Sequence, residues 1–192
     1  LPRNFRAAGL LPERSDAAVV PRVAGTSAVL AGSCSSATRA QVAAWAKAHR
    51  AVALDPLAGD AAAIAAHALR AVEADLAAGK PFLVYSTAAP DAVAAVQSTL
   101  GRERSAALIE EAFSLLARRF VERGVRRLVV AGGETAGAVV QALGVEALAI
   151  GPEIDPGVPW TTSIGTRPLA LALKSGNFGA EDFFAKSLAM LA

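Results

Sequence analysis

Three short turns, rich in glycine and in hydroxyl side chains, contain most of the residues in this sequence that could bind a ligand. They are Gly32-Ser33-Cys34-Ser35-Ser36, Gly132-Gly133-Glu134-Thr135 and Lys174-Ser175-Gly176-Asn177-Phe178-Gly179. Each turn follows a short apolar run and precedes a helix-like stretch. A strand that turns into a helix in this way directs backbone N–H groups and the positive helix end at one point, where an anion can bind. Three such turns in 192 residues indicate a ligand that carries phosphate.

The third turn has the residue types best suited to a phosphate. Lys174 supplies a positive charge, and Gly176 and Gly179 let the backbone approach a ligand closely. Asn177 tolerates the left-handed backbone that a sharp turn demands. We therefore expect Lys174 to contact phosphate directly.

The other two turns each have a structural and a ligand-binding interpretation. The hydroxyls of Ser33 and Ser35 either cap the following helix or contact a nucleotide. In the second turn, Thr135 either caps a helix or belongs to a phosphate-binding loop. Glu134 either holds Mg²⁺ through water or stabilises the helix N-terminus electrostatically.

The sequence assigns no catalytic residue and no set of metal ligands. Cys34 lies at a predicted helix start, which favours a thiolate, and Asp55 follows a predicted strand, where a turn role is equally suitable. The two histidines, His49 and His67, fall in predicted helices away from the glycine turns. Neither a Ser-His-Asp set nor an H-E-x-x-H motif can be assembled, and the P-loop and G-x-G-x-x-G spacings are absent.

The elements around these turns alternate between strands and helices. The predicted strands are 27–31, 51–54, 80–86, 127–131 and 147–150, the predicted helices are 38–50, 59–78, 91–100, 102–123, 135–143 and 180–191, and a hairpin joins 158–161 to 169–173. This order predicts a three-layer α/β domain whose mixed, mostly parallel sheet is flanked by helices. Because ligands bind outside the carboxyl ends of parallel strands, we expect the three turns to converge on one cleft.

Composition excludes several classes of protein. The hydrophobic content of 54% comes largely from alanine, and charged residues interrupt every long apolar stretch, so no spanning helix and no membrane partner are expected. A net charge of +2 and 5% aromatic residues do not suit a nucleic-acid partner. The single cysteine excludes an internal disulfide and fits a cytoplasmic protein.

The turns, together with two further positions and one further segment, also resemble the motifs of a known family. Gly32 to Ser35 with Thr38 and Gln41, then Gly132 to Thr135, Gly151-Pro152-Glu153 and Leu173 to Gly179 are similar, in order and spacing, to successive motifs of the four-carbon acid sugar kinases. The resemblance extends over nearly the whole chain. It concerns only the C-terminal, nucleotide-binding half of those enzymes.

The resemblance implies a domain that binds ATP and Mg²⁺ within a kinase for a sugar acid of the erythronate, threonate or 3-oxo-tetronate type. The nucleotide-contacting residues that it implies are Ser33, Ser35, Gly132, Gly133, Glu134, Thr135, Gly151, Lys174, Gly176 and Asn177. Residues 1–26 would form the crossover from an N-terminal domain, and residues 27–192 the nucleotide-binding domain. The acid sugar and the catalytic base would belong to the N-terminal domain, so we expect this chain alone to be inactive.

One alternative from a different class stays open at this point. The same turns would suit a non-catalytic module that binds a nucleotide or a sugar phosphate. The identity of the acid sugar and the oligomeric state, a homodimer among the alternatives, are left open by the sequence.

Overall fold

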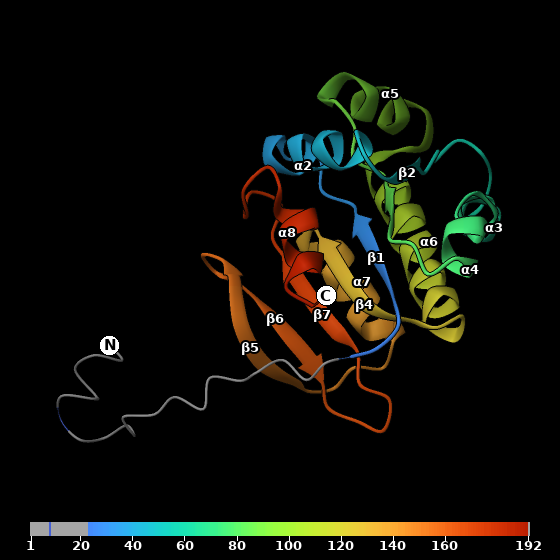
Figure 1. Cartoon of the computed structure of the whole chain (residues 1–192). Helices are drawn as coiled ribbons and strands as arrows, with labels where there is room; N and C mark the ends of the chain where they lie inside the picture. Colours follow the sequence, from blue (N-terminus) through green and yellow to red (C-terminus); the bar gives the residue numbers. More distant parts are fainter. Residues whose placement is uncertain (1–7, 9–22, 192) are drawn as a thin grey trace.

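The computed structural model describes residue 8 and residues 23–191, so most of the predicted crossover segment, residues 1–26, lies outside the described residues. The described part contains seven strands and seven helices (Figure 1). The strands are β1 (Thr26–Ala31), β2 (Arg50–Ala53), β3 (Phe82–Tyr85), β4 (Val125–Ala131), β5 (Leu148–Asp155), β6 (Val158–Ser163) and β7 (Ala170–Lys174). The helices are α2 (Ser36–Ala46), α3 (Ala61–Ala71), α4 (Glu73–Ala77), α5 (Pro90–Leu100), α6 (Arg102–Glu122), α7 (Gly133–Ala142) and α8 (Phe183–Ala189).

All seven strands form one mixed sheet in the order β2-β3-β1-β4-β7-β6-β5. The first five strands of this order are parallel, and β6 and β5 add two antiparallel pairings at one edge. The predicted mostly parallel, mixed sheet is therefore confirmed. Because β1, β4 and β7 are neighbours, the three turns that follow them leave the sheet side by side at its carboxyl edge.

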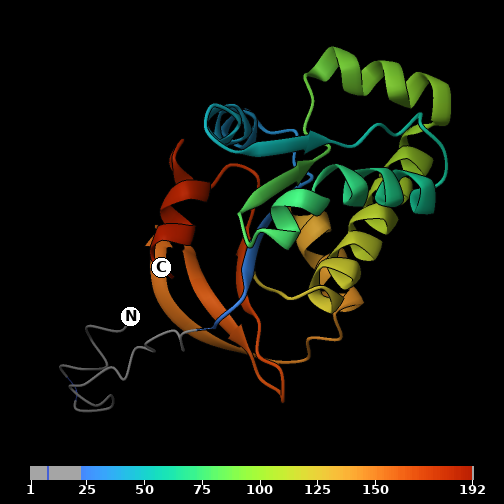
Figure 2. The same cartoon turned by 45° about the vertical axis from the view of Figure 1, so that its right-hand side comes forward.

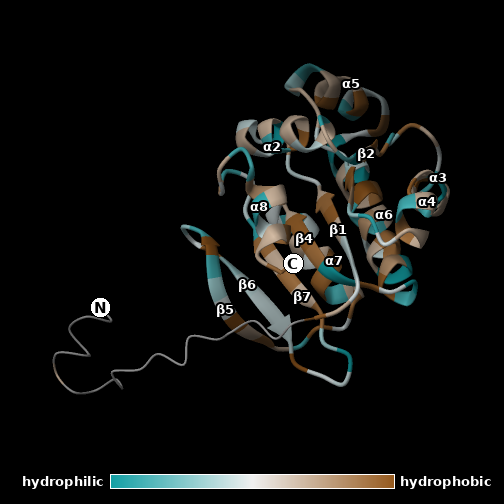
Figure 3. Ribbon diagram, in the orientation of Figure 1, coloured by the Kyte–Doolittle hydropathy of each residue, from teal (hydrophilic) through white to brown (hydrophobic). Residues whose placement is uncertain are grey.

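Helices cover both faces of the sheet, as the alternating side chains of β1 show. Ala28 and Leu30 pack into a core with α3, α6 and α7, whereas Val29 and Ala31 pack on the opposite face with α2 and α8. Figure 2 shows these layers from a second side, and Figure 3 shows apolar residues concentrated in the central strands. The three-layer architecture is that of parallel strands buried on both faces.

Several element boundaries differ from the prediction. The predicted helix 38–50 ends at Ala46, and Arg50 begins β2. The predicted helix 59–78 is divided into α3 and α4 at Val72, and the last helix begins at Phe183 because residues 180–182 form a turn. The predicted strand 147–150 is longer in the structure, since β5 continues as far as Asp155. An edge strand tolerates Pro152 because only one of its sides is paired, and the register with β6 shifts between Ile150 and Glu153.

Within the described residues, no helix combines the length and the apolar character needed to cross a membrane. The longest, α6, carries charged residues at both ends and in its middle.

Three glycine turns and an adjoining cavity as the candidate functional site

The three glycine turns meet at the carboxyl edge of the sheet. A Cβ atom on Gly32 would lie 2.0 Å from Thr135 Oγ1, and a Cβ atom on Gly176 would lie 2.2 Å from Ser33 Oγ. Side chains from the first and second turns therefore occupy the space that any larger residue would need at these positions. The predicted convergence of the turns at one edge of the sheet is confirmed, although only the first two turns line the cavity described below.

The start of helix α2 holds the third turn through the backbone carbonyl oxygen of Gly176. The carbonyl of Gly176 accepts hydrogen bonds from Ser35 Oγ at 2.7 Å, from Thr38 Oγ1 at 2.8 Å and from Lys174 Nζ at 3.0 Å. Because the C=O and N–H of a trans peptide point in opposite directions, the N–H of Asn177 is directed away from α2. This N–H is thereby presented on the exposed side of the turn, where Asn177 itself lies.

The far end of the same turn is fixed by two further side chains. Gln41 Nε2 lies 3.1, 3.0 and 2.9 Å from the carbonyl oxygens of residues 178–180. Asp155 accepts a hydrogen bond of 2.9 Å from the N–H of Ala180 and forms an ion pair with Lys186. The hydrogen bonds from Lys186 and from the Ala180 N–H lower the pKa of Asp155. The turn is thus held at both ends.

Lys174 lies inside this turn. Its side chain is buried, with 2% of the residue exposed, and Nζ donates to Thr38 Oγ1 at 3.1 Å and to the carbonyls of Ser175 and Gly176 at 3.2 and 3.0 Å. These contacts give the ammonium group protein partners on the inner side of the turn. A direct contact between Lys174 and phosphate stays a prediction.

Burial of Lys174 predicts a dependence of stability on pH. Desolvation lowers the pKa of Lys174 to about 8 in the folded protein, against 10.5 for an ordinary lysine. Between these values the unfolded chain binds one more proton than the folded chain, so the free energy of unfolding should rise with pH. The rise should reach up to roughly 3 kcal/mol relative to Lys174→Met, at ~1.36 kcal/mol per pKa unit.

The measurement is urea unfolding of both proteins from pH 7 to 10.5. Lys174→Met is the control, since it retains every other titrating group. A difference in unfolding free energy that stays constant across this range would show that the ammonium group is not desolvated.

Ser35 caps α2, which confirms the capping interpretation for this hydroxyl. Its Oγ lies 3.2 Å from the N–H of Thr38 while it also contacts the carbonyl of Gly176. One hydroxyl therefore supports both the start of α2 and the third turn. Ser33 Oγ lies 3.2 Å from the N–H of Ser35 and so braces the turn from inside.

The N-terminus of α7 is arranged differently, and of the two interpretations of Thr135 the helix cap is wrong. The N-cap residue is Gly132, which has no side chain to cap the helix, and Thr135 lies inside the first turn, buried against Gly32. No side chain of the described residues caps α7. The N–H groups at the start of α7, beside Gly133, lie beside a cavity and are available to a ligand.

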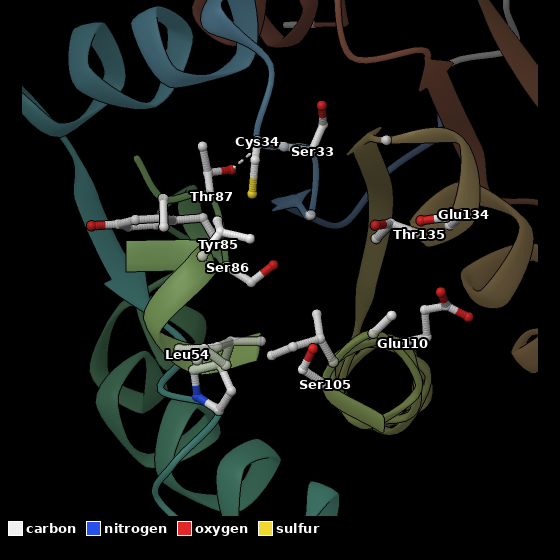
Figure 4. Close-up of a pocket in the computed structure, with 18 of the residues that line it drawn as sticks. Ser33, Cys34, Leu54, Tyr85, Ser86, Thr87, Ser105, Glu110, Glu134 and Thr135 are labelled. Carbon is white, nitrogen blue, oxygen red and sulfur yellow. Dashed lines mark hydrogen bonds between the residues drawn. The ribbon is translucent and has the colours of Figure 1, made fainter. Parts of the chain in front are cut away.

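That cavity has a volume of about 710 Å³ and adjoins the first two turns (Figure 4). Its walls come from the carboxyl ends of β1 to β4 and from α5 and α6. Figure 4 shows Thr87 on one side of the space and Glu110 and Glu134 on the other, with the sulfur of Cys34 directed between them. We call this space the α5–α6 cavity.

Two polar contacts define the β2 and β3 sides of the α5–α6 cavity. Thr87 Oγ1 donates to the carbonyl of Ser33 at 2.9 Å and thereby links the end of β3 to the first turn. Asp55 Oδ1 accepts from the N–H of Leu57 at 2.8 Å, which confirms its role as a turn residue. Asp55 also lines the cavity.

The structure does not place every predicted site residue together. The first turn, the second turn and residues 174–177 are in contact, but Gly151 lies within β5, and β6 separates that strand from β7. The sequence did not indicate Thr87 or Glu110 as members of the site. Thr87 follows the end of a parallel strand and could have been found by that rule, whereas Glu110 lies in the middle of α6 and carries no such signal.

Comparisons with known proteins match this geometry. The model of the nucleotide-binding C-terminal domain family matches residues 28–184. A 3-oxo-tetronate kinase of Cupriavidus necator is 55% identical over 195 residues, which cover 100% of this chain and 44% of that kinase. The crystal structure of Haemophilus influenzae protein HI1011 has a TM-score of 0.84 and 34% identity, covering 97% of this chain and 45% of that one.

A more distant structure adds a description of assembly. A Bordetella bronchiseptica protein with bound citrate, described as a domain-swapped dimer, has a TM-score of 0.67 and 27% identity over 87% of this chain and 41% of its own. The chain spans less than half the length of each of these proteins. By its family match and its relatives, the chain belongs to the nucleotide-binding C-terminal domain family of the four-carbon acid sugar kinases.

Proposed function

We propose that this chain binds ATP as part of a kinase that phosphorylates a four-carbon sugar acid of the 3-oxo-tetronate type. The observation that carries the proposal is the meeting of three glycine turns at one point of the sheet edge, in a domain 55% identical to the corresponding part of a 3-oxo-tetronate kinase. The acid sugar itself comes from the name of that relative.

The residues of the three turns would position the phosphates. Transfer of a phosphoryl group depends mainly on positioning and on electrostatic stabilisation, and backbone N–H groups supply both. The start of α7 at Gly133 and the N–H of Asn177 are the donors that the turns present outward. Ser35, Thr38 and Gln41 would act indirectly, because they hold the third turn in place.

The side chains present also fit Mg²⁺ in the form that kinases use. Mg²⁺ is usually held by one or two carboxylates together with substrate phosphates and water. Glu134 lines the α5–α6 cavity at the second turn, beside the start of α7 (Figure 4). Within the described residues, no three His, Cys, Asp or Glu side chains gather into a metal site, so phosphate oxygens would have to complete the coordination. Bound Mg²⁺ would neutralise charge on the phosphates.

A thermal-shift panel tests the proposal. ATP, ADP, NAD and sugar phosphates would be compared at equal concentrations with Mg²⁺ present, because a ligand that binds only the folded state raises the midpoint according to its concentration over its Kd. We expect ATP and ADP to raise the midpoint and NAD to leave it unchanged. Shifts with sugar phosphates alone would favour a non-catalytic sugar-phosphate module, and a shift with NAD alone would exclude the kinase.

The oligomeric state of this chain is a separate question. The Bordetella bronchiseptica relative is described as a domain-swapped dimer. A homodimer of this chain stays a prediction.

A further inference from the structure

The α5–α6 cavity contains features that the glycine turns do not need for holding phosphate. Only its inner end is built from the turns, by Gly32, Ser33 and residues 132–135. The rest extends between α5, α6 and the ends of β2 and β3. A volume of about 710 Å³ lies within the range that small-molecule sites occupy.

The charges that line this cavity are all negative. Asp55, Glu110 and Glu134 are the charged residues among those that form its walls, and no lysine, arginine or histidine of the described chain lines it. A triphosphate lying along these walls would meet carboxylates and no cationic side chain. Phosphates therefore suit only the inner end, beside the start of α7, and the remaining volume suits an uncharged group.

Two helices contribute apolar side chains to the lining of the cavity. Ala92, Val93 and Val96 of α5 form one wall, and Ala106 and Ile109 of α6 belong to the lining as well. Helix α5 has no fully buried residue: Val93 and Val96 are half-buried where α5 packs against α6, and Ala92 is exposed at the cavity. Apolar surface of this kind is stabilised when a ligand removes it from water.

Polar groups lie at separate positions on the lining. Ser86 and Thr87 supply hydroxyls at the end of β3, Gln97 supplies an amide from α5, and Glu110 supplies a carboxylate from α6. Hydroxyls and an amide can pair with the edge of a nucleobase, and a carboxylate accepts hydrogen bonds from ribose hydroxyls. An apolar slot with a few polar groups is the usual form of a site for such a ligand.

We propose that the α5–α6 cavity holds the nucleoside half of the nucleotide, with the base between α5 and α6 and the phosphates at the glycine turns. The inference rests on the proposed function for the identity of the ligand. It adds which cavity takes the uncharged half and assigns α5 as one wall of the base site.

The test measures binding of the nucleoside half and of the phosphate half of ATP separately. Val96→Trp places a large side chain inside the cavity, and Ala94→Trp, on the opposite side of α5 and outside the lining, is the matched control. Calorimetric titration would compare ATP, adenosine and inorganic tripolyphosphate for both variants and for the unaltered chain. We expect Val96→Trp to lower the affinity for ATP at least about tenfold, equivalent to ~1.4 kcal/mol. Its affinity for tripolyphosphate should stay unchanged.

Cys34 gives an independent readout in the same samples. It is the single cysteine, it is exposed, and its sulfur is directed into the cavity (Figure 4). In alkylation by iodoacetamide the thiolate sulfur attacks the methylene carbon and iodide leaves. Adenosine should slow this reaction in the unaltered chain and in Ala94→Trp, but not in Val96→Trp.

The outcomes distinguish the inference from the proposed function. If ATP binds the unaltered chain and Val96→Trp affects it no more than Ala94→Trp does, the cavity assignment is overturned while the kinase proposal stands. If adenosine protects Cys34 but ATP does not bind, the cavity assignment stands and the kinase proposal fails. The cavity assignment is overturned if neither ATP nor adenosine binds. It is also overturned if Val96→Trp lowers the affinity for tripolyphosphate as much as the affinity for ATP. Ala92→Trp, on the same wall, replaces Val96→Trp if that variant unfolds.

Discussion

Gly133→Val should lower the affinity for Mg-ATP by at least about a hundredfold, or ~2.7 kcal/mol, while the protein stays folded. A Cβ atom on Gly133 meets no other atom within 4 Å beyond its chain neighbours and its own helix, so the added side chain has room within the protein. It would project at the uncapped start of α7, where we place the phosphates. The midpoint of thermal unfolding should change little, since valine at an exposed helix start is close to neutral.

Gly137→Val is the matched control for this variant. Gly137 lies one turn further along α7, is also exposed, and also has no atom within 4 Å of a built Cβ. It lies outside the lining of the α5–α6 cavity. Calorimetric titration would compare the ATP affinities of the two variants. Equal affinities would mean that the start of α7 contacts no phosphate.

This chain by itself should bind Mg-ATP but transfer no phosphate to a four-carbon sugar acid. The candidate phosphate contacts lie within residues 32–177, whereas the relatives extend over more than twice the matched length, and we expect their acid-sugar contacts there. Transfer requires the attacking hydroxyl and the γ-phosphate to be held in line, which the two halves must achieve together. Turnover should therefore fall to the uncatalysed background.

The assay couples ADP release to a panel of erythronate, threonate and their 3-oxo forms, with calorimetry in parallel. Binding without turnover is the expected pair of results. ADP release that depends on a sugar acid would sink the idea that the second half is required. Absence of nucleotide binding at millimolar ligand would favour the non-kinase alternative. A Kd of about 1 mM corresponds to a binding free energy of only ~4 kcal/mol.

The sequence was sufficient to predict which strands bring the turns together. Alternating strands and helices imply parallel pairing, and parallel pairing places the ends of β1, β4 and β7 at one edge. Gly176 was predicted to let the backbone approach a ligand, whereas the structure shows Gly32 and Gly176 packed against Thr135 and Ser33 of the neighbouring turns. Local pattern and global topology agree at this edge.

The direction of individual side chains could not be predicted from the sequence. Lys174 has the residue type of a phosphate ligand, but its orientation depends on Thr38, a residue 136 positions away that receives its ammonium group. Glu110 has the ordinary composition of a helix surface, and its place in the cavity depends on how α6 crosses the sheet. Gly151 was assigned to the site by the family resemblance alone, and the structure places it in the edge strand β5, which pairs with β6.

The hydrogen bonds on the Gly176 carbonyl have a consequence for the order of folding. Ser35 and Thr38 are 141 and 138 residues from Gly176 along the chain. Contacts of such separation form late, because a long loop must first be closed against its entropy. No partly folded intermediate that lacks β7 can contain the complete turn cluster. Nucleotide binding should therefore appear only with the last cooperative step of refolding, and bound ATP would report the fully folded population alone.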